Sequence, residues 1–196
     1  MKDKKIARLV GGLGILCIVV LVVFFVLNQN SEDGIFAKKE NTSTEVQNIL
    51  AKDIDRNYPA TVREVVRLFS RISKCYHNES ISESEFEQLL LMQRKLFDEE
   101  FLNNNPLETF VNSLSSEVTT IKESEQTMVS YHVQKQSSVI TWESGEHHFS
   151  SIIASYTLKT GSEYEKTYEE FLLREDEDGR WKIVGWRLTD PIEIIE

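Results

Sequence analysis

The adjacent residues His147 and His148 are the first candidates for chemistry, because the carboxylates Glu143 and Glu146 stand beside them in the sequence. Histidine and carboxylate side chains are common zinc ligands. Adjacent residues of a regular strand point to opposite faces, however, so the two imidazoles would not share one ion. The spacing of the two glutamates also matches no recognised ligand set. The pattern is more typical of a solvated hairpin end, and we expect no metal site.

Other features that could carry chemistry are weak. The acidic run from Glu175 to Asp178 resembles a calcium-binding loop in charge, but its spacing does not match one. Cys75 has Tyr76 and His77 beside it and no third partner in the sequence, which is more typical of a buried helix thiol. The sequence has neither a glycine-rich phosphate loop nor a Ser-His-Asp order. It therefore predicts no catalytic residues and no cofactor.

The distribution of charge disfavours one class of partner. The chain of 196 residues has a net charge of −10, and its first 27 residues carry +3 because four basic side chains there outnumber one acidic side chain. Residues 28–196 therefore carry −13. A domain this acidic repels phosphate backbones, so we expect no nucleic acid partner. The negative charge itself is typical of a soluble surface.

The segment Leu9–Leu27 is long and apolar enough to cross a bilayer. Its 19 consecutive uncharged residues just span a hydrocarbon core of ~30 Å as a helix. A secretory signal peptide is the alternative, but the exit Val26–Asn30 lacks a small-x-small cleavage site. The basic residues precede the segment, so residues 1–8 should form a cytoplasmic tail. We expect a single-pass protein of the cell membrane whose C-terminal domain is extracytoplasmic.

Helical signals follow this segment. Residues 28–57 are expected to form a polar linker that ends in a short amphipathic lead-in helix. The first strong helix begins with the capping-box pair Thr61 and Glu64, and its apolar residues then recur every three or four positions. A second helix is predicted over residues 82–103, and a third begins at Asn105–Pro106 with Asn105 as its cap. The domain is therefore expected to contain three helices.

After residue 122 the apolar pattern changes from a helical period to alternation. Strands are predicted over residues 129–133, 139–142, 149–158, 164–174 and 180–188. In the last strand, Ile183 and Gly185 should lie on one face and Trp186 on the other. Helices followed by antiparallel strands indicate an α+β domain over residues 58–190, with three helices packed on one face of a curved antiparallel sheet. Residues 191–196 form a C-terminal tail.

Three runs carry a resemblance to a known fold and family. The ending FLLREDEDGRWKIVGW, together with the helices before it, is similar to nuclear-transport-factor-two-like domains, also called SnoaL-like or cystatin-like cone domains. With YPATVREVVRLFSRISKCY and KLFDEEFLNNNP, the chain resembles an uncharacterised bacterial family whose members have an N-terminal membrane helix and one cone domain. The resemblance covers most of residues 45–188. It implies a fold and a topology but no activity.

Cone domains of this kind often enclose a ligand pocket between sheet and helices. Some relatives are isomerases or dehydratases with an Asp, a His or a Tyr there, where burial shifts a carboxyl pKa toward neutrality. This chain has no residue-by-residue match to such a catalytic set. The polar residues that could line a pocket are Tyr76, Tyr131, His132, Tyr156 and Trp186. The alternative is that each is a core aromatic whose polar tip forms a hydrogen bond.

Three functions remain open at this stage. The first is a non-enzymatic, membrane-anchored module that binds or assembles with an unidentified envelope protein, because tethering raises its effective concentration for other membrane-bound partners. The second is a small-ligand sensor or enzyme, which predicts an open cavity with a buried carboxyl of raised pKa. The third is a structural homodimer through the exposed sheet face. We favour the first.

Overall fold

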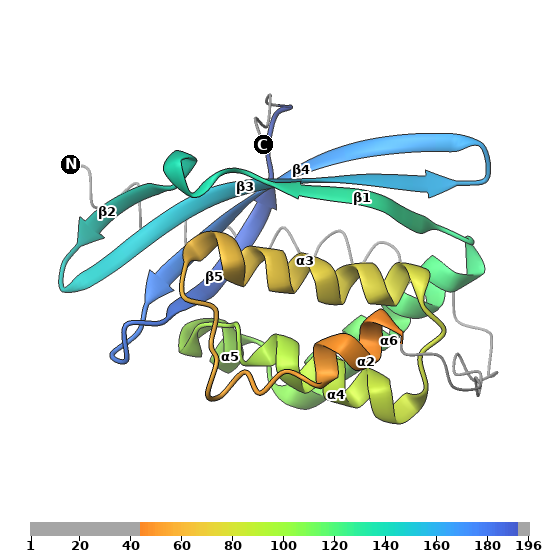
Figure 1. The fold of residues 1–196 in the computed structure, drawn as a ribbon, viewed down its shortest axis with the longest axis horizontal. Helices are drawn as coiled ribbons and strands as arrows, with labels where there is room; N and C mark the ends of the chain where they lie inside the picture. Colours follow the sequence, from red (N-terminus) through yellow and green to blue (C-terminus); the bar gives the residue numbers. More distant parts are fainter. Residues whose placement is uncertain (1–43, 192–196) are drawn as a thin grey trace.

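A computed structural model of the chain describes residues 44–191, and Figure 1 shows them as a sheet with the helices on one side. The helices are α2 (Glu45–Leu50), α3 (Val62–Asn78), α4 (Glu83–Arg94), α5 (Glu99–Asn104) and α6 (Leu107–Glu123). The strands are β1 (Thr127–Val133), β2 (Ile140–Ser144), β3 (His147–Thr160), β4 (Glu163–Glu175) and β5 (Trp181–Leu188), with a 3₁₀ turn at Gln136–Ser138. The fold is α+β with an antiparallel sheet of five strands.

The expected fold, one transmembrane helix followed by a domain of three helices, is wrong for the described residues. They contain five helices, and none of these is long and apolar enough to span a membrane. The segment Leu9–Leu27, to which the membrane prediction applies, lies outside the described residues. One of the five, α2, is the predicted lead-in helix, and it packs on α3 and α4. The additional helix is the short α5.

Helix α5 is separate because the helix predicted over residues 82–103 breaks in the middle. α4 ends at Arg94, and the next residues lie against the edge of β5. There Ile183 donates its N–H to the carbonyl of Leu96 at 2.8 Å and accepts the N–H of Asp98 at 2.9 Å. Asp98 then caps the start of α5. These contacts with a distant strand replace helical hydrogen bonds, which periodicity along the chain does not predict.

The central strand of the sheet is β3. The strand order is β1-β3-β4-β5, and β2 pairs with the start of β3. β5 pairs only with Glu169–Glu175 of β4, so the first half of β4 and the end of β3 extend beyond β5 as a hairpin (Figure 1). We call residues 155–168 the hairpin arm.

A bulge in β5 overturns the predicted faces of that strand. The register shifts between Leu172, which pairs with Gly185, and Leu173, which pairs with Ile183. Trp186 pairs with Phe171, so Trp186 and Ile183 both face the helices, contrary to the prediction. One extra residue reverses the alternation beyond it, because strand side chains have a period of two.

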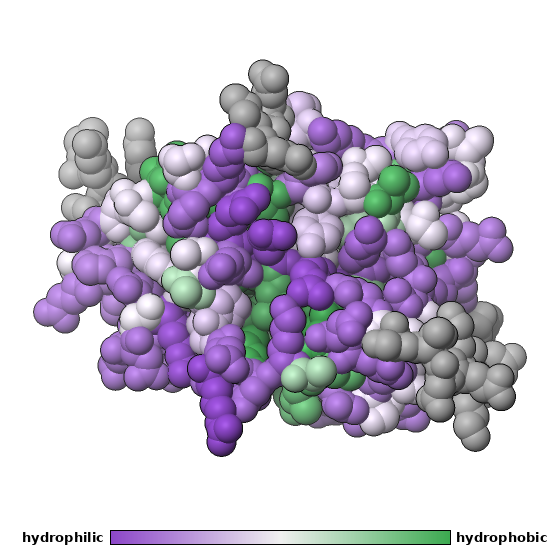
Figure 2. All heavy atoms as spheres, viewed as in Figure 1, coloured by the Kyte–Doolittle hydropathy of each residue, from purple (hydrophilic) through white to green (hydrophobic). Residues whose placement is uncertain are grey.

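The hydrophobic core lies between α3 and the helix-facing side of the sheet. α3 contributes the buried stripe that its period predicted. The fully or almost fully buried side chains of the core include Val65, Val66, Phe69, Ile72, Leu89, Phe97, Ile152, Ala154, Phe171, Leu173 and Ile183. Figure 2 shows one face, which is mostly hydrophilic and has hydrophobic residues in small separate patches, one of them near its centre. The two layers therefore bury their apolar faces against each other.

Candidate functional site

Tyr76, the first predicted pocket residue, lies between two helices. It is on α3, is 3% exposed, and donates its hydroxyl to the side-chain carbonyl of Gln93 on α4 at 3.3 Å. Its ring packs on Phe86 with a centroid distance of 5.9 Å. Burial raises the pKa of the Tyr76 hydroxyl above its usual value, so the group stays neutral. Tyr76 therefore links α3 to α4.

Tyr156 is buried on the other side of α3. It lies on β3, is 5% exposed, and its hydroxyl is 3.0 Å from Oγ of Ser70. Ser70 donates its single proton to the carbonyl of Val66 at 2.8 Å, so Tyr156 donates to Ser70. Burial raises the pKa of Tyr156 well above its usual value. The hydroxyl satisfies a buried polar pair and joins the sheet to α3.

Trp186 lies in a group of rings that we call the aromatic cluster. Its members are Phe69, Phe97, Phe101, Phe110, Phe171 and Trp186. The Trp186 ring is 5.1 Å from Phe69 and 5.9 Å from Phe171, centroid to centroid. Rings at these distances attract each other and leave little room between them. The space between β5 and α3 is therefore filled by side chains.

Tyr131 and His132 are neighbours on β1 and point to opposite sides of the sheet. Tyr131 pairs with Tyr156 and faces the helices, half-buried, where it forms a side-chain hydrogen bond with Arg67. His132 pairs with Ser155 and faces away from the helices. The structure therefore brings Tyr131 and Tyr156 together as cross-strand neighbours. It does not bring all five predicted residues into one pocket.

One carboxyl that the sequence did not single out faces the helices from the sheet. Glu169 on β4 pairs with Ala154, whose side chain is in the core, and it is half-buried. Burial raises the pKa of Glu169 to about 7, and the negative charge of Glu117 on α6 adds to this increase. Glu117 itself is exposed. The register of β4 against β3 reveals the orientation of Glu169, and the sequence alone does not supply that register.

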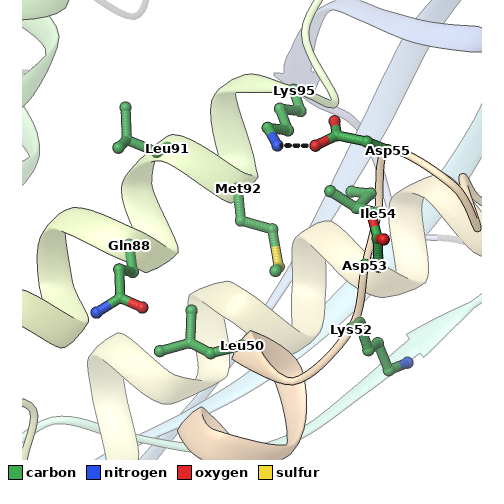
Figure 3. A pocket seen from close by; sticks show the side chains of 9 residues that line it. All are labelled: Leu50, Lys52, Asp53, Ile54, Asp55, Gln88, Leu91, Met92 and Lys95. Carbon is green, nitrogen blue, oxygen red and sulfur yellow. Dashed lines mark hydrogen bonds and ion pairs between the residues drawn. The ribbon is translucent and has the colours of Figure 1, made fainter.

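Two hollows on the surface have other linings. The first, ≈290 Å³ in volume, lies between the α2–α3 loop and α4, where Lys95 forms an ion pair of 2.6 Å with Asp55 (Figure 3). The second, ≈280 Å³ in volume, lies at the hairpin arm and is lined by Gln126, Leu158, Thr160, Glu163, Tyr164 and Glu165. None of the five predicted residues lines either hollow.

His147 and His148 occupy an exposed hairpin end with different neighbours. His148 lies 2.8 Å from a carboxylate oxygen of Glu175 and 3.5 Å from one of Glu143. His147 instead contacts the ring of Phe149, at a centroid distance of 6.3 Å. In the part of the chain that the structure describes, no group of three His, Cys, Asp or Glu residues is placed to hold a metal ion.

Cys75 is a buried helix residue. Its side chain is 1% exposed, and burial raises the pKa of its thiol to about 12, with the negative charge of Glu45 adding to the increase. A thiol reacts as the thiolate, which is scarce at neutral pH when the pKa is this high. Cys75 therefore contributes packing at this position.

The fold places the described chain among α+β proteins in which helices cover one side of an antiparallel sheet. A family model described as a domain of unknown function, DUF6715, matches residues 1–186, so the chain belongs to this family. A search of curated proteins finds no match to the chain.

Proposed function

We propose that this protein is a non-enzymatic binding or assembly module of the cell envelope that acts through its surface. The observation that carries the proposal is the filled interior. Leu89, Phe97 and Phe171 have exposures of 0%, 2% and 0% in the space where a ligand would have to bind. The hydroxyl groups of Tyr76 and Tyr156 form hydrogen bonds with Gln93 and Ser70, respectively. Groups that are buried and hydrogen-bonded in this way stabilise the fold and offer nothing to a substrate.

The location of the module remains a prediction from the sequence. We propose that residues 9–27 attach the chain to the cell membrane, with the N-terminus in the cytoplasm and the described domain outside. We also propose that this domain is related to the nuclear-transport-factor-two-like cone domains, as the resemblance implies. Attachment would keep the domain at a high effective concentration near other membrane-bound proteins. Protease accessibility of the domain in intact cells tests its side of the membrane.

Cross-linking from chosen surface positions tests the proposed function. A photoreactive amino acid replaces Tyr164 on the hairpin arm, which is 65% exposed, or Leu91 on α4, which is 51% exposed, in the full-length chain in its own cells. A binding module gives a discrete protein adduct from one position and not from the other. The proposal fails if neither position gives an adduct and a small molecule purifies with the chain instead.

A second candidate, a small-ligand sensor or enzyme, is favoured by Glu169 alone. A half-buried carboxyl with a pKa of about 7 has the property that a general acid or base needs. The Glu169→Gln substitution keeps the size of the side chain and removes its titration. A ligand-binding role predicts that this variant loses a compound that purifies with the original chain. Unchanged retention of such a compound counts against this candidate.

A third candidate, the structural homodimer, is favoured by apolar side chains on the sheet. Ile140 and Trp142 on β2 are 64% and 36% exposed. Their partners Ser151 and Phe149 place them on the side of the sheet that faces away from the helices. Sedimentation of the full-length chain in detergent gives the oligomeric state. A monomer at micromolar concentration would exclude a stable dimer.

A further inference from the structure

We propose that the free edge of β4 in the hairpin arm binds an extended peptide of a partner protein as an added strand. The peptide carries basic residues toward the helix side of the sheet and acidic residues toward the other side. This inference rests on the proposed binding function, since it names the surface and the chemistry of the partner. Strand addition is a common mode of peptide recognition, in which backbone bonds give affinity and alternate side chains give specificity.

Among residues 44–191, no strand pairs with this edge of β4 in the hairpin arm, because β5 stops short of it. In the described chain, β5 pairs with β4 no further than Glu169, and the last contact is the N–H of Thr189 donated to the carbonyl of Tyr168 at 2.9 Å. If the chain continued in the same register, Pro191 would come opposite Lys166. Proline has no N–H to donate there. Pro191 therefore cannot donate to a ladder along the arm in this register.

The backbone groups along this edge point outward. The carbonyl of Tyr168 accepts from the β5 side, and in an antiparallel strand the groups of alternate residues point the same way. The N–H and C=O groups of Lys166 and Tyr164 therefore point away from β3. A row of such groups is a template for another strand.

The two faces of the arm have opposite charge. Glu165 pairs with Leu158 and Glu163 with Thr160, and both glutamates lie on the side of the sheet that faces the helices. Lys166, on the other face, lies over the ring of Tyr168 at 5.2 Å. On that same face Lys159 lies over the ring of Tyr164 at 5.7 Å. An added strand with basic residues on one face and acidic residues on the other complements both.

The second hollow lies at the arm, with a lining that reaches from Gln126 and β3 to Glu163 and Glu165 of β4. Its lining combines the two carboxylates, Glu163 and Glu165, with the apolar side chain of Leu158. A lysine or arginine side chain matches this combination, because its stem is apolar and its tip is cationic. The neighbouring residue of an extended peptide points to the opposite face, where Lys166 favours a carboxylate. The site therefore selects alternating basic and acidic residues.

A second copy of this chain fits the free edge of β4 less well than a peptide of a different protein does. Two β4 edges related by a twofold axis pair antiparallel with their faces aligned, so residues of the same face stand opposite each other. Centring such a pair on the arm places Glu165 opposite Glu165, or Lys166 opposite Lys166. Like charges directly opposite are destabilising. The charges that discourage self-pairing also favour a complementary partner.

Two peptides of identical composition test the charge pattern. One alternates lysine and glutamate over eight residues, which places all lysines on one face of a strand. The other repeats Lys-Lys-Glu-Glu, which mixes the two charges on each face. Fluorescence anisotropy with the full-length chain in non-ionic detergent should give at least about tenfold tighter binding for the alternating peptide. Equal affinities would overturn the proposal, because net charge alone would then explain binding.

Methylated peptides test the backbone contacts without any change in the protein. N-methylation of alternate residues of the alternating peptide removes the N–H groups on one edge, and two peptides are needed to cover both edges. One of them should bind about tenfold more weakly, since its methyl groups face β4. Amide exchange at Lys166 and Tyr164 should slow with the unmethylated peptide. Unchanged affinity for both methylated peptides overturns strand addition.

Charge reversal in the protein locates the site. Lys166→Glu should weaken binding of the alternating peptide about tenfold, while Lys52→Glu, an equal change of charge at an exposed position by the first hollow, should leave it unchanged. Equal effects of the two changes, or self-association through the arm in sedimentation, overturn the proposal. If the peptides fail while cross-links from Tyr164 persist, strand addition is wrong and the proposed binding function still stands.

Discussion

The two halves of strand β4 use the same alternating pattern for opposite purposes. In the half that pairs with β5, Phe171 and Leu173 point toward the helices and are 0% exposed. In the hairpin arm, the corresponding positions are Glu163 and Glu165, and both are exposed. The half that pairs with β5 is bonded on both edges, whereas the half in the hairpin arm is bonded on one. A single strand, β4, thus packs in the core at one end and has an edge available for binding at the other.

Charged groups differ in the same way between the two regions. Near β5, Arg174 forms hydrogen bonds to both carboxylate oxygens of Asp98, and the Asp98 side chain is 6% exposed. In the arm, Lys159 and Lys166 lie over exposed or half-buried tyrosine rings. Breaking the buried pair should destabilise the fold, whereas the two lysines of the arm should contribute little to stability.

The largest expected effect on stability comes from a substitution in the core half of β4. Phe171→Ala removes a fully buried ring that contacts Phe69 and Trp186. The free energy of unfolding should fall by about 4 kcal/mol, from lost burial and the cavity left behind. Tyr164→Ala, the matched removal of an aromatic side chain from the arm, should cost about 0.5 kcal/mol or less. Urea unfolding measures both. Similar losses would show that the arm belongs to the core.

The buried ion pair gives the next effect. Asp98→Ala leaves Arg174 with only the 3.5 Å contact to Glu100 and removes the cap of α5, so the free energy of unfolding should fall by about 3 kcal/mol. Asp55→Ala breaks the exposed pair with Lys95 and should cost less than about 1 kcal/mol. Urea titration of both variants checks the order. If the two substitutions cost the same, the Asp98 pair is not the link between α5 and the sheet.

The fold could be predicted from the sequence where short-range signals decide the structure. The Thr61 hydroxyl caps α3 by accepting the N–H of Glu64, as the spacing indicates, although the Glu64 carboxylate accepts the N–H of Ala60 and not that of Thr61. α3 also carries its apolar stripe into the core. At the next break, Asn105 was expected to cap the third helix. Instead Asn105 ends α5, with its side-chain amide donating to the carbonyl of Phe101, and Pro106 precedes α6. Asn105 could either end α5 or cap α6, and in the structure it ends α5.

The candidate site could not be predicted in the same way. Tyr156 and Glu169 lie on adjoining strands and face the helices together only through the β3–β4 register. The bulge at Val184 similarly decides which face Trp186 occupies. The open edge of β4 depends on where β5 stops relative to a strand that precedes it in the chain. Each of these features depends on pairing between residues that are distant in the sequence. A local pattern of apolar and polar residues does not predict such pairing.

His77 on α3 should make a smaller contribution to the free energy of unfolding, and this contribution depends on pH. Burial lowers the pKa of His77 to about 4, and the positive charge of Lys122 adds to this decrease. The folded chain keeps His77 neutral, while the unfolded chain binds a proton below the ordinary pKa of 6.5. This stability is therefore present above pH 6.5 and is lost as the pH falls toward 4.

His77→Gln isolates that contribution. Between pH 7 and pH 4.5, the free energy of unfolding of the unchanged chain should fall by about 2 kcal/mol more than that of the variant. Urea titrations at the two pH values give the difference. Parallel losses in both proteins would mean that His77 is not held neutral in the folded chain.

The smallest effect on stability is expected from the arm itself. Lys166→Glu should change the free energy of unfolding by no more than about 0.5 kcal/mol, because the side chain is exposed and is not part of the core. The same substitution should weaken the alternating peptide about tenfold. Thermal unfolding and anisotropy on one preparation compare the two. A large loss of stability in the Lys166→Glu variant would show that the arm contributes to the fold as the core does, contrary to this account.

Amide hydrogen exchange of the full-length chain with the alternating peptide tests the central claim most directly. The account predicts that the N–H groups of Tyr164 and Lys166 slow at least about tenfold, since a new strand covers them. Exchange at Ser70 and Ile72, on α3 in the filled interior, should not change. Slowing confined to Ser70 and Ile72, or no change at any residue, would contradict a protein that binds through its hairpin arm.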